Sequence, residues 1–133
     1  MNVLLISGLA VITPDADASA RFYVGTLGLT LTDDDGYRHS NEIQGVKHFG
    51  VWPLSAAAQA CFGTDEWPAG TPAPTATIDF DVDDVAAAAA EMETAGYTLI
   101  HSARTEPWGQ TVARVMSSEG VLITLAYTPW FRE

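Results

Sequence analysis

Two aspartates in the stretch ATIDFDV are the residues of this sequence best suited to chemistry. Asp79 and Asp81 alternate with apolar residues, which is the pattern of a strand with one apolar and one polar face. Carboxylates that face bulk water add solubility, whereas carboxylates that face a cavity select ligands with positive charge or hydrogen-bond donors. The side of the sheet that they occupy therefore decides what they indicate about function.

Aromatic residues are expected beside this polar face. On the predicted strand VKHFGVWPL, Phe49 and Val51 take the core parity, which leaves His48 and Trp52 on the opposite side. Trp108 lies in the loop RTEPWGQ, before another predicted strand. Flat side chains of this kind bind flat ligands, or else pack in a core or a dimer interface.

Arg114 lies between apolar neighbours in the predicted strand TVARVMS. Because a guanidinium needs polar partners, we expect it to face away from the core. There it would pair with Asp79 or Asp81, or hold a ligand carboxylate.

Composition limits the class of protein. The chain has 133 residues, 47% of them hydrophobic, which is enough for one globular domain with its own core. Its net charge of −11 repels phosphates and favours cations, which argues against a nucleic-acid partner. The single Cys61 is read as a small buried hydrophobe, and the start MNVLLISGLAVI lacks a basic region and the length of a membrane span. We therefore expect a cytoplasmic protein with no membrane partner.

The chain contains a weak internal repeat. In each half an apolar or alternating run leads to an aspartate, then a helical segment, then a glycine and another apolar run. Asp15 and Asp84 suit the starts of the two helices, and Gly28 and Gly96 suit their left-handed ends. Short strands follow each helix, so each half predicts the order β-α-β-β-β.

These units predict one domain over residues 1–133, with module one at 1–54, a linker at 55–74 and module two at 75–133. The linker begins with a predicted short helix, LSAAAQACF, and ends in the Gly/Pro-rich stretch PAGTPAPT. The predicted fold is α+β, in which two βαβββ modules form a curved, cupped mixed sheet with helices on its outer face.

The segments ARFYVGTLGLTL, DVDDVAAAAAEMETAGY, EPWGQT and SSEGVLITL, in this order, resemble the vicinal oxygen chelate superfamily. This superfamily includes glyoxalases, bleomycin-resistance proteins and extradiol dioxygenases, and the resemblance covers nearly the whole chain. It implies that Thr77, Asp79 and Asp81 line the cup. The alternative, an exposed edge strand with its aspartates in solvent, stays open.

The resemblance also bears on metal binding. Metal-dependent members carry His, Gln or Glu at three positions that correspond here to Gly8, Thr77 and Thr124. None of these can be an anionic or imidazole ligand, and the fourth position falls near His48 or Phe49. We therefore expect no metal cofactor at the usual site, although a displaced site that combines His48 with Asp79 or Asp81 stays open.

The leading interpretation is a homodimeric small-molecule-binding protein that resembles bleomycin-resistance proteins. It would sequester a cationic or planar aromatic ligand without a metal, as in antibiotic resistance. Its expected ligand-binding residues are His48, Trp52, Asp79, Asp81, Trp108 and Arg114. Trp130 and Phe131 are expected to cover a hydrophobic surface, such as that of a partner subunit.

Two other interpretations remain. One is a glyoxalase-like lyase or isomerase, or a related dioxygenase, with a shifted metal or with proton transfer by Asp79, Glu106 or His48. No catalytic residue can be assigned from the sequence. The other is a structural or regulatory dimer without a ligand.

Overall fold

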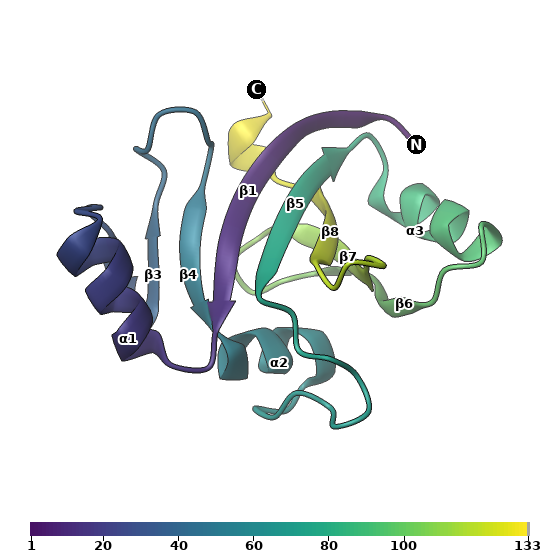
Figure 1. Cartoon of the computed structure of the whole chain (residues 1–133). Coiled ribbons are helices and arrows are strands. Elements are labelled where there is room, and N and C mark those ends of the chain that lie inside the picture. Colours follow the sequence, from purple (N-terminus) through teal and green to yellow (C-terminus); the bar gives the residue numbers. More distant parts are fainter. Residues whose placement is uncertain (133) are drawn as a thin grey trace.

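The computed structural model describes residues 1–132 and contains one mixed sheet of eight strands (Figure 1). Along the sheet the strands follow the order β2-β3-β4-β1-β5-β8-β7-β6. The strands are β1 (Val3–Thr13), β2 (Thr32–Asp34), β3 (Tyr37–Ser40), β4 (Phe49–Pro53), β5 (Ala76–Val82), β6 (Leu99–Thr105), β7 (Thr111–Met116) and β8 (Leu122–Tyr127). The α+β prediction and the βαβββ order of both halves are confirmed.

The helices are short. They are α1 (Ala16–Ala20), which continues as the π-helix η1 (Arg21–Thr26), α2 (Leu54–Phe62), α3 (Val85–Thr94) and the 3₁₀-helix η2 (Pro129–Phe131). Within residues 1–132, none of them has the length and apolar character needed to cross a membrane.

The two modules meet at their first strands. β1 and β5 are antiparallel neighbours, with Gly8 opposite Asp79, and register shifts interrupt this pair near its start. Each first strand also pairs in parallel with the last strand of its own module, β1 with β4 and β5 with β8. Both modules of one chain therefore share one sheet, and the seam between them runs through its centre.

The helix starts follow the sequence prediction. Asp15 Oδ1 accepts from the Ala18 backbone N–H at 3.0 Å, and Asp84 Oδ1 accepts from that of Ala87 at 3.0 Å. These bonds satisfy N–H groups that the first turn of a helix leaves without partners.

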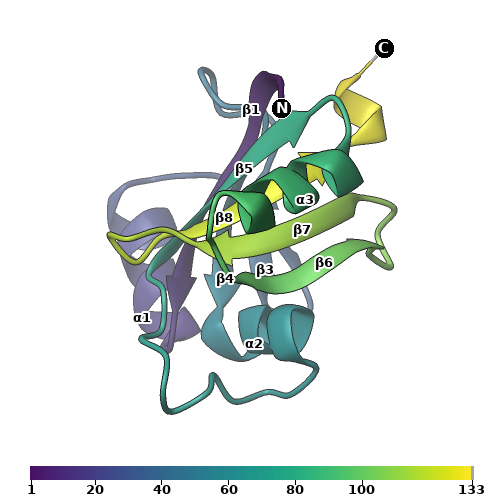
Figure 2. The ribbon, with the colours of Figure 1, turned by 90° about the vertical axis from the view of Figure 1, so that its right-hand side faces the viewer.

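Two apolar clusters hold the helices to the sheet. Helix α3 lies over β7 and β8 (Figure 2), where the buried residues are Val82, Val85, Ala88, Ala89, Ala113 and Leu125. Alanine on the helix face allows this close approach. Helix α2 contributes Ala57 and Cys61 to the second cluster, where they pack with Ile12 and Leu122 of the sheet. Trp67 packs against this cluster. Burial raises the pKa of the Cys61 thiol, as expected for a structural cysteine.

A tight hairpin joins β2 to β3. Asp35 and Gly36 both have positive φ angles, 52° and 93°, as a two-residue type I′ turn requires. Asp33 Oδ1 accepts from the Gly36 backbone N–H at 2.9 Å. The turn therefore places the acidic residues 33–35 at the tip of the hairpin.

Asp81 holds the C-terminal segment instead of facing a ligand. This fully buried carboxylate accepts from the Thr128 backbone N–H and hydroxyl, both at 2.8 Å, and from Arg132 Nε at 2.9 Å. Arg132 also donates to the Ala126 carbonyl at 3.0 Å. The prediction that Asp81 binds a ligand is therefore corrected, because residues after the last strand use its acceptor capacity.

Replacing Asp81 by Asn should lower the free energy of unfolding by roughly 2–4 kcal/mol, because Arg132 loses its counter-ion and an amide N–H meets other donors. Urea unfolding at neutral pH measures this change. The control is Asp17→Asn on the exposed surface of α1, which removes the same charge. Equal unfolding midpoints for the two variants would contradict the anchoring role.

Candidate functional site

A cavity of about 740 Å³ opens over the seam between the two modules. Ser7 of β1 and Thr77 and Asp79 of β5 form its floor. Residues of β3 and β4 line one side, and residues of β7, β8 and the C-terminal segment line the other. A volume of this size suits a drug-sized molecule.

A second, more open hollow of about 730 Å³ lies between α2 and the linker. Its walls are mostly prolines, alanines and other small residues, with Asp65 and Glu66 at the surface. Trp67 borders it, but the Trp67 ring packs edge-on against Phe62 at 4.9 Å as part of the core. The convergent polar groups lie in the first cavity, so we assign the candidate site there.

Five of the six predicted ligand-binding residues line the first cavity. They are His48, Trp52, Asp79, Trp108 and Arg114. The predicted alternation of core and cavity residues along β4 agrees with the structure. Val51 is buried, and Phe49 contacts Tyr23 on the outer side, with ring centres 5.8 Å apart. Their contact with a ligand remains a prediction.

Asp79 lies at the middle of the floor, between Gly8 of β1 and Thr124 of β8. A Cβ atom at Gly8 would lie 3.4 Å from Asp79 Oδ2, so a larger side chain there would compete with the carboxylate for space. Burial raises the pKa of Asp79 to about 6, against the lowering effect of the Arg114 charge and of hydrogen bonds from Thr124 and Gln110. This carboxyl can therefore change its charge near neutral pH.

A hydrogen-bonded chain of three side chains forms the wall beside Asp79. His48 Nδ1 lies 2.6 Å from Asn41 Oδ1 and must donate to it, which leaves Nε2 to accept from the Tyr37 hydroxyl. Burial, aided by His39, lowers the pKa of His48 to about 4, so the imidazole is neutral at physiological pH. Burial also raises the pKa of Tyr37, and the charge of Asp79 adds to this effect.

Gly50 makes room for the Tyr37 ring. A Cβ atom at Gly50 would lie 2.2 Å from the Tyr37 hydroxyl oxygen, well inside the contact limit of two heavy atoms. Only glycine at this position of β4 allows Tyr37 to lie flat against the strand and reach His48.

Arg114 does not pair with either aspartate, which corrects the sequence prediction. Its side chain is 3% exposed, and Nη1 donates to Glu106 at 2.9 Å, to His101 Nε2 at 3.1 Å and to the Ala60 carbonyl at 3.5 Å. The guanidinium lies 5.8 Å from the centre of the Trp52 ring. Within residues 1–132, Arg114 Nε is buried and has no hydrogen-bond partner.

Glu106 is committed to this ion pair. Its Oε1 also lies 3.3 Å from Arg104 Nε, so two guanidinium groups share one carboxylate oxygen. His101 donates from Nδ1 to the Ser102 carbonyl at 2.8 Å, and burial lowers the pKa of His101. Neither group is free to act as an acid or base on a ligand.

Tryptophans form the outer part of the cavity. Trp108 is 50% exposed, and its Nε1 donates to Gln110 Oε1 at 3.0 Å. Gln110 Nε2 in turn donates to the Thr128 hydroxyl at 2.8 Å, which links this loop to the C-terminal segment. Trp130, 47% exposed, and Phe131 line the same side with ring centres 6.0 Å apart.

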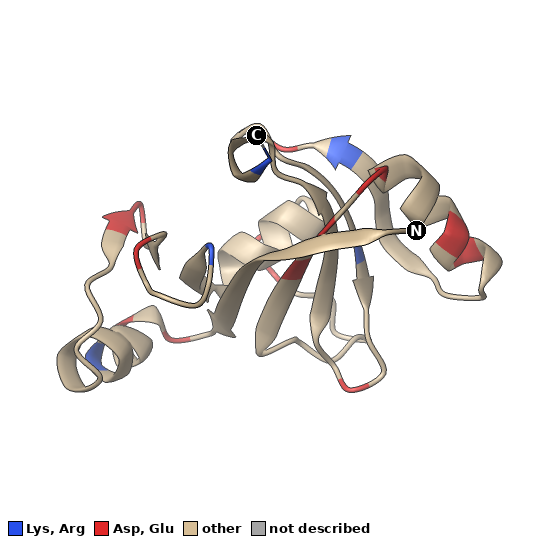
Figure 3. Cartoon of the chain, turned by 90° about the horizontal axis from the view of Figure 1, so that it is seen from above, with Lys and Arg blue, Asp and Glu red and all other residues tan. Residues whose placement is uncertain are grey.

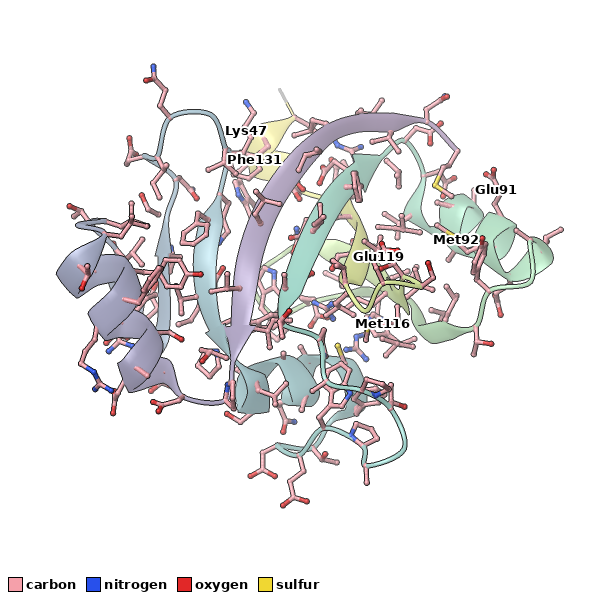
Figure 4. The ribbon with its side chains drawn as sticks, in the orientation of Figure 1. Lys47, Glu91, Met92, Met116, Glu119 and Phe131 are labelled. Atoms are coloured by element: carbon pink, nitrogen blue, oxygen red, sulfur yellow. The ribbon has the colours of Figure 1, made fainter. Side chains whose placement is uncertain are left out.

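The C-terminal pair was expected to cover a partner subunit, whereas it lines the cavity of its own chain. Figure 4 shows Lys47 beside Phe131, with its Nζ 6.0 Å from the ring centre. The sequence contains no signal that Trp130 and Phe131 lie at the cavity. Their location depends on the contacts that hold the segment after β8 to Asp81.

Sequence reasoning also missed Tyr37, His39 and Asn41, all of which line the cavity. A signal was present, since these residues alternate along YRHSNEI and share one face of the strand. Gln110 was missed as well, although it follows Trp108 closely in the same loop.

The positions that the superfamily resemblance aligns with metal ligands carry an unsuitable set of donors. Gly8 has no side chain, the hydroxyls of Thr77 and Thr124 lie 3.3 Å apart as a hydrogen-bonded pair, and His48 Nε2 faces Tyr37. Across residues 1–132, no three His, Cys, Asp or Glu side chains converge as they would around a metal ion. The residues present therefore do not fit a divalent metal at the usual place.

The electrostatic character of the cavity is acidic. Asp34 and Asp35 stand at its edge and Asp79 on its floor, and His39 contacts Asp34. The guanidinium that lines the cavity, Arg114, is balanced by Glu106. Figure 3 shows acidic positions on both modules and few basic ones, in line with the net charge of −11.

Comparison with known proteins gives a family match. Residues 5–125 match the profile described as Glyoxalase/Bleomycin resistance protein/Dioxygenase superfamily. No curated protein sequence matches the chain significantly.

Among solved structures, a member of this superfamily from Vibrio splendidus 12B01 is 14% identical, with a TM-score of 0.58 over 92% of this chain and 97% of that one. A variant of Streptomyces coelicolor methylmalonyl-CoA epimerase in complex with 2-nitronate-propionyl-CoA is 17% identical, with a TM-score of 0.56 over 96% of each chain. A hypothetical protein from Bacillus halodurans C-125 is 19% identical, with a TM-score of 0.59 over 93% of this chain and 94% of that one. At these identities the similarity concerns the fold alone.

Asp79→Asn should change stability in a pH-dependent way. The folded-state pKa of Asp79 is raised from its ordinary 3.8 to about 6, so ionisation costs the folded protein stability as the pH rises from 4 through 6. The variant does not incur this cost. Relative to the unmodified protein it should gain roughly 1–2 kcal/mol between pH 4 and pH 7, less than the full shift implies because water reaches the cavity. Urea unfolding at several pH values tests this prediction, with Asp17→Asn as the control for the loss of one surface charge. A stability difference between Asp79→Asn and the unmodified protein that does not change with pH would contradict it.

Proposed function

Because the chain belongs to the glyoxalase/bleomycin resistance protein/dioxygenase superfamily, we propose that it uses the cavity of this fold to bind a flat, positively charged aromatic molecule. The binding needs no metal and leads to no chemical change. The observation that carries this proposal is an aromatic cavity in which the carboxylate on the floor, Asp79, forms no ion pair with any of residues 1–132.

The walls support a flat ligand. Trp52 borders the cavity next to the Arg114 guanidinium, and Trp108 and Trp130 form its half-exposed outer part. Aromatic rings offer large contact areas at small entropic cost, and their faces attract cations. Half-exposed tryptophans on a surface are costly to leave in water, so a ligand that covers them is stabilised.

The charges support a cationic ligand. Asp79 is desolvated on the floor, and a cation beside it would restore the interactions that burial removes. Asp34 and Asp35 add negative potential at the entrance, where it speeds the approach of a cation. Removal of such a compound from free solution in the cytoplasm would protect the cell from it, as antibiotic-resistance proteins do.

The enzymatic alternative has one observation in its favour, because a carboxyl with a pKa near 6 suits proton transfer. Catalysis by Asp79 would also need a second acid or a metal to stabilise the charge that forms. Both nitrogens of His48 are hydrogen-bonded to other side chains, and Glu106 is ion-paired. Neither of these two expected candidates therefore supplies the second acid. Ligand binding without turnover is therefore the better-supported function.

Proflavine, a flat acridine cation, should quench tryptophan fluorescence saturably. Asp79→Asn should weaken this binding at least about ten-fold and reduce its salt dependence, because the partly buried carboxylate on the cavity floor supplies the attraction. Affinity should rise between pH 5 and pH 7 as Asp79 ionises. Asp17→Asn, with the same charge change outside the cavity, should bind as the unmodified protein does. Equal affinities for the two variants, or near one divalent ion per purified chain by elemental analysis, would overturn the proposal.

We also propose that the protein is a homodimer. Leu4 and Ile6 of the central strand β1 are 52% and 51% exposed, and in Figure 1 helices α1 and α3 lie to either side of β1 and β5 without covering them. Apolar residues on a central strand are normally covered, and a second copy of the chain would cover them symmetrically.

Sedimentation velocity tests the dimer. The double variant Leu4→Glu with Ile6→Glu should sediment as a monomer, because four charges would meet in the proposed interface. Tyr97→Glu, which introduces a charge at a residue 59% exposed beyond α3, is the control and should leave the dimer intact. A monomer for the unmodified protein at micromolar concentration would rule out the proposal.

A further inference from the structure

The Asp79 carboxylate on the cavity floor has acceptor capacity that the chain leaves unused. An ionised carboxylate has about four positions for hydrogen bonds, and the side chains that donate to this one are Thr124 and Gln110. The Thr124 hydroxyl also lies 3.3 Å from that of Thr77, and Gln110 also donates to Thr128. Asp79 lines the cavity and is only partly buried, so its remaining positions are within reach of a ligand.

A glycine leaves one side of this carboxylate uncovered. Gly8 lies opposite Asp79 in the neighbouring strand, and a Cβ atom at Gly8 would lie 3.4 Å from Asp79 Oδ2. Any other residue at this position would therefore place side-chain atoms against that oxygen. Because Gly8 has none, Oδ2 and Oδ1 can act on a ligand together.

The floor of the cavity also keeps a net negative charge. Arg114 is close enough to lower the pKa of Asp79, but its guanidinium is paired with Glu106 at 2.9 Å. Among residues 1–132, no cationic side chain forms an ion pair with Asp79 itself. A partly buried carboxylate of this kind is best stabilised by a cation that brings its own N–H donors and is weakly hydrated.

We infer that Asp79 binds the fork of a cyclic amidinium, the flat group in which a protonated ring nitrogen adjoins a carbon that carries an amino group. The two parallel N–H groups of the fork donate to Oδ1 and Oδ2, as a guanidinium does to a carboxylate. The ring that carries the fork lies against the aromatic wall that includes Trp52. The inference rests on the proposed binding function and narrows its ligand to flat heterocycles with this fork.

Other cations fit the carboxylate less well. A quaternary ammonium group carries a charge but no N–H, so it leaves the open acceptor positions of Asp79 unfilled. A primary ammonium group donates, but it is more strongly hydrated than a delocalised cation, so its transfer to a partly buried site costs more. An amidinium combines charge, donors and a flat ring in one plane, which matches a carboxylate beside aromatic walls.

Calorimetric titration of the unmodified protein at pH 7 with two isomeric cations tests the inference. Protonated 2-amino-4-methylquinoline carries the fork, whereas in 2-amino-1-methylquinolinium the methyl group occupies the ring nitrogen and removes one of its two arms. Ring system, charge and size are the same, so the isomer without the fork should bind at least about ten-fold more weakly.

The outcomes separate this inference from the function on which it rests. Equal or stronger binding of the isomer without the fork, or no binding of either isomer where proflavine binds, overturns the amidinium assignment and leaves the proposed function standing. Failure of all three cations to bind overturns both.

Gly8→Ala gives a second test at the level of the protein. The added methyl group contacts Asp79 Oδ2 and obstructs one arm of the fork, so the affinity ratio between the two isomers should fall towards one. Gly25→Ala in η1 is the matched control, because a Cβ atom there meets no atom within 4 Å. Neither glycine has a positive φ angle, so alanine suits both positions of the backbone.

The control variant should keep the affinity ratio of the unmodified protein. An unchanged ratio in Gly8→Ala would show that Oδ2 takes no part in binding and would overturn the fork. If Gly8→Ala does not fold, the comparison of the two isomers on the unmodified protein still decides the question.

Discussion

The structure depends on the rule that a buried charge must find a partner. Asp81 and Glu106 are buried near the cavity, Asp79 is partly buried on its floor, and the chain provides cationic partners for the first two. Asp81 is held by Thr128 and Arg132, and Glu106 is held by Arg104 and Arg114. Burial raises the pKa of Asp79, and within residues 1–132 no ion pair offsets this effect. The contrast among the three separates carboxylates that build the fold from the one available to a ligand.

The same rule explains the unusual residues around Asp79. Gly8 has no side chain, and the carboxylate of Asp79 on the neighbouring strand lies in the space beside it. Thr77 and Thr124 pair with each other through their hydroxyls. The positions that the superfamily resemblance aligns with metal ligands thus carry small side chains, and one carboxylate lies beside them.

Much of this could be predicted from the sequence, because the relevant signals are local. Asp15 and Asp84 mark helix starts by side chains that act three residues away, and strand parity gives the cavity side for His48, Trp52 and Asp79. The errors concern which partner each charged side chain takes. Asp81 pairs with Arg132, 51 positions later, and Arg114 pairs with Glu106 in the loop before β7. Neither spacing nor periodicity contains such information, since both partners depend on how separate strands and loops meet.

The seam between β1 and β5 has a mechanical consequence. The opposite walls of the cavity belong to different modules, and the pair of strands that joins them is irregular in register. Irregular pairs bend and twist more readily than regular ones. A rotation about this line would alter the spacing of the walls, but it would also repack the cluster beneath α2, where Ile12 of module one meets Leu122 of module two. The width of molecule that fits between the walls is therefore limited by this shared cluster.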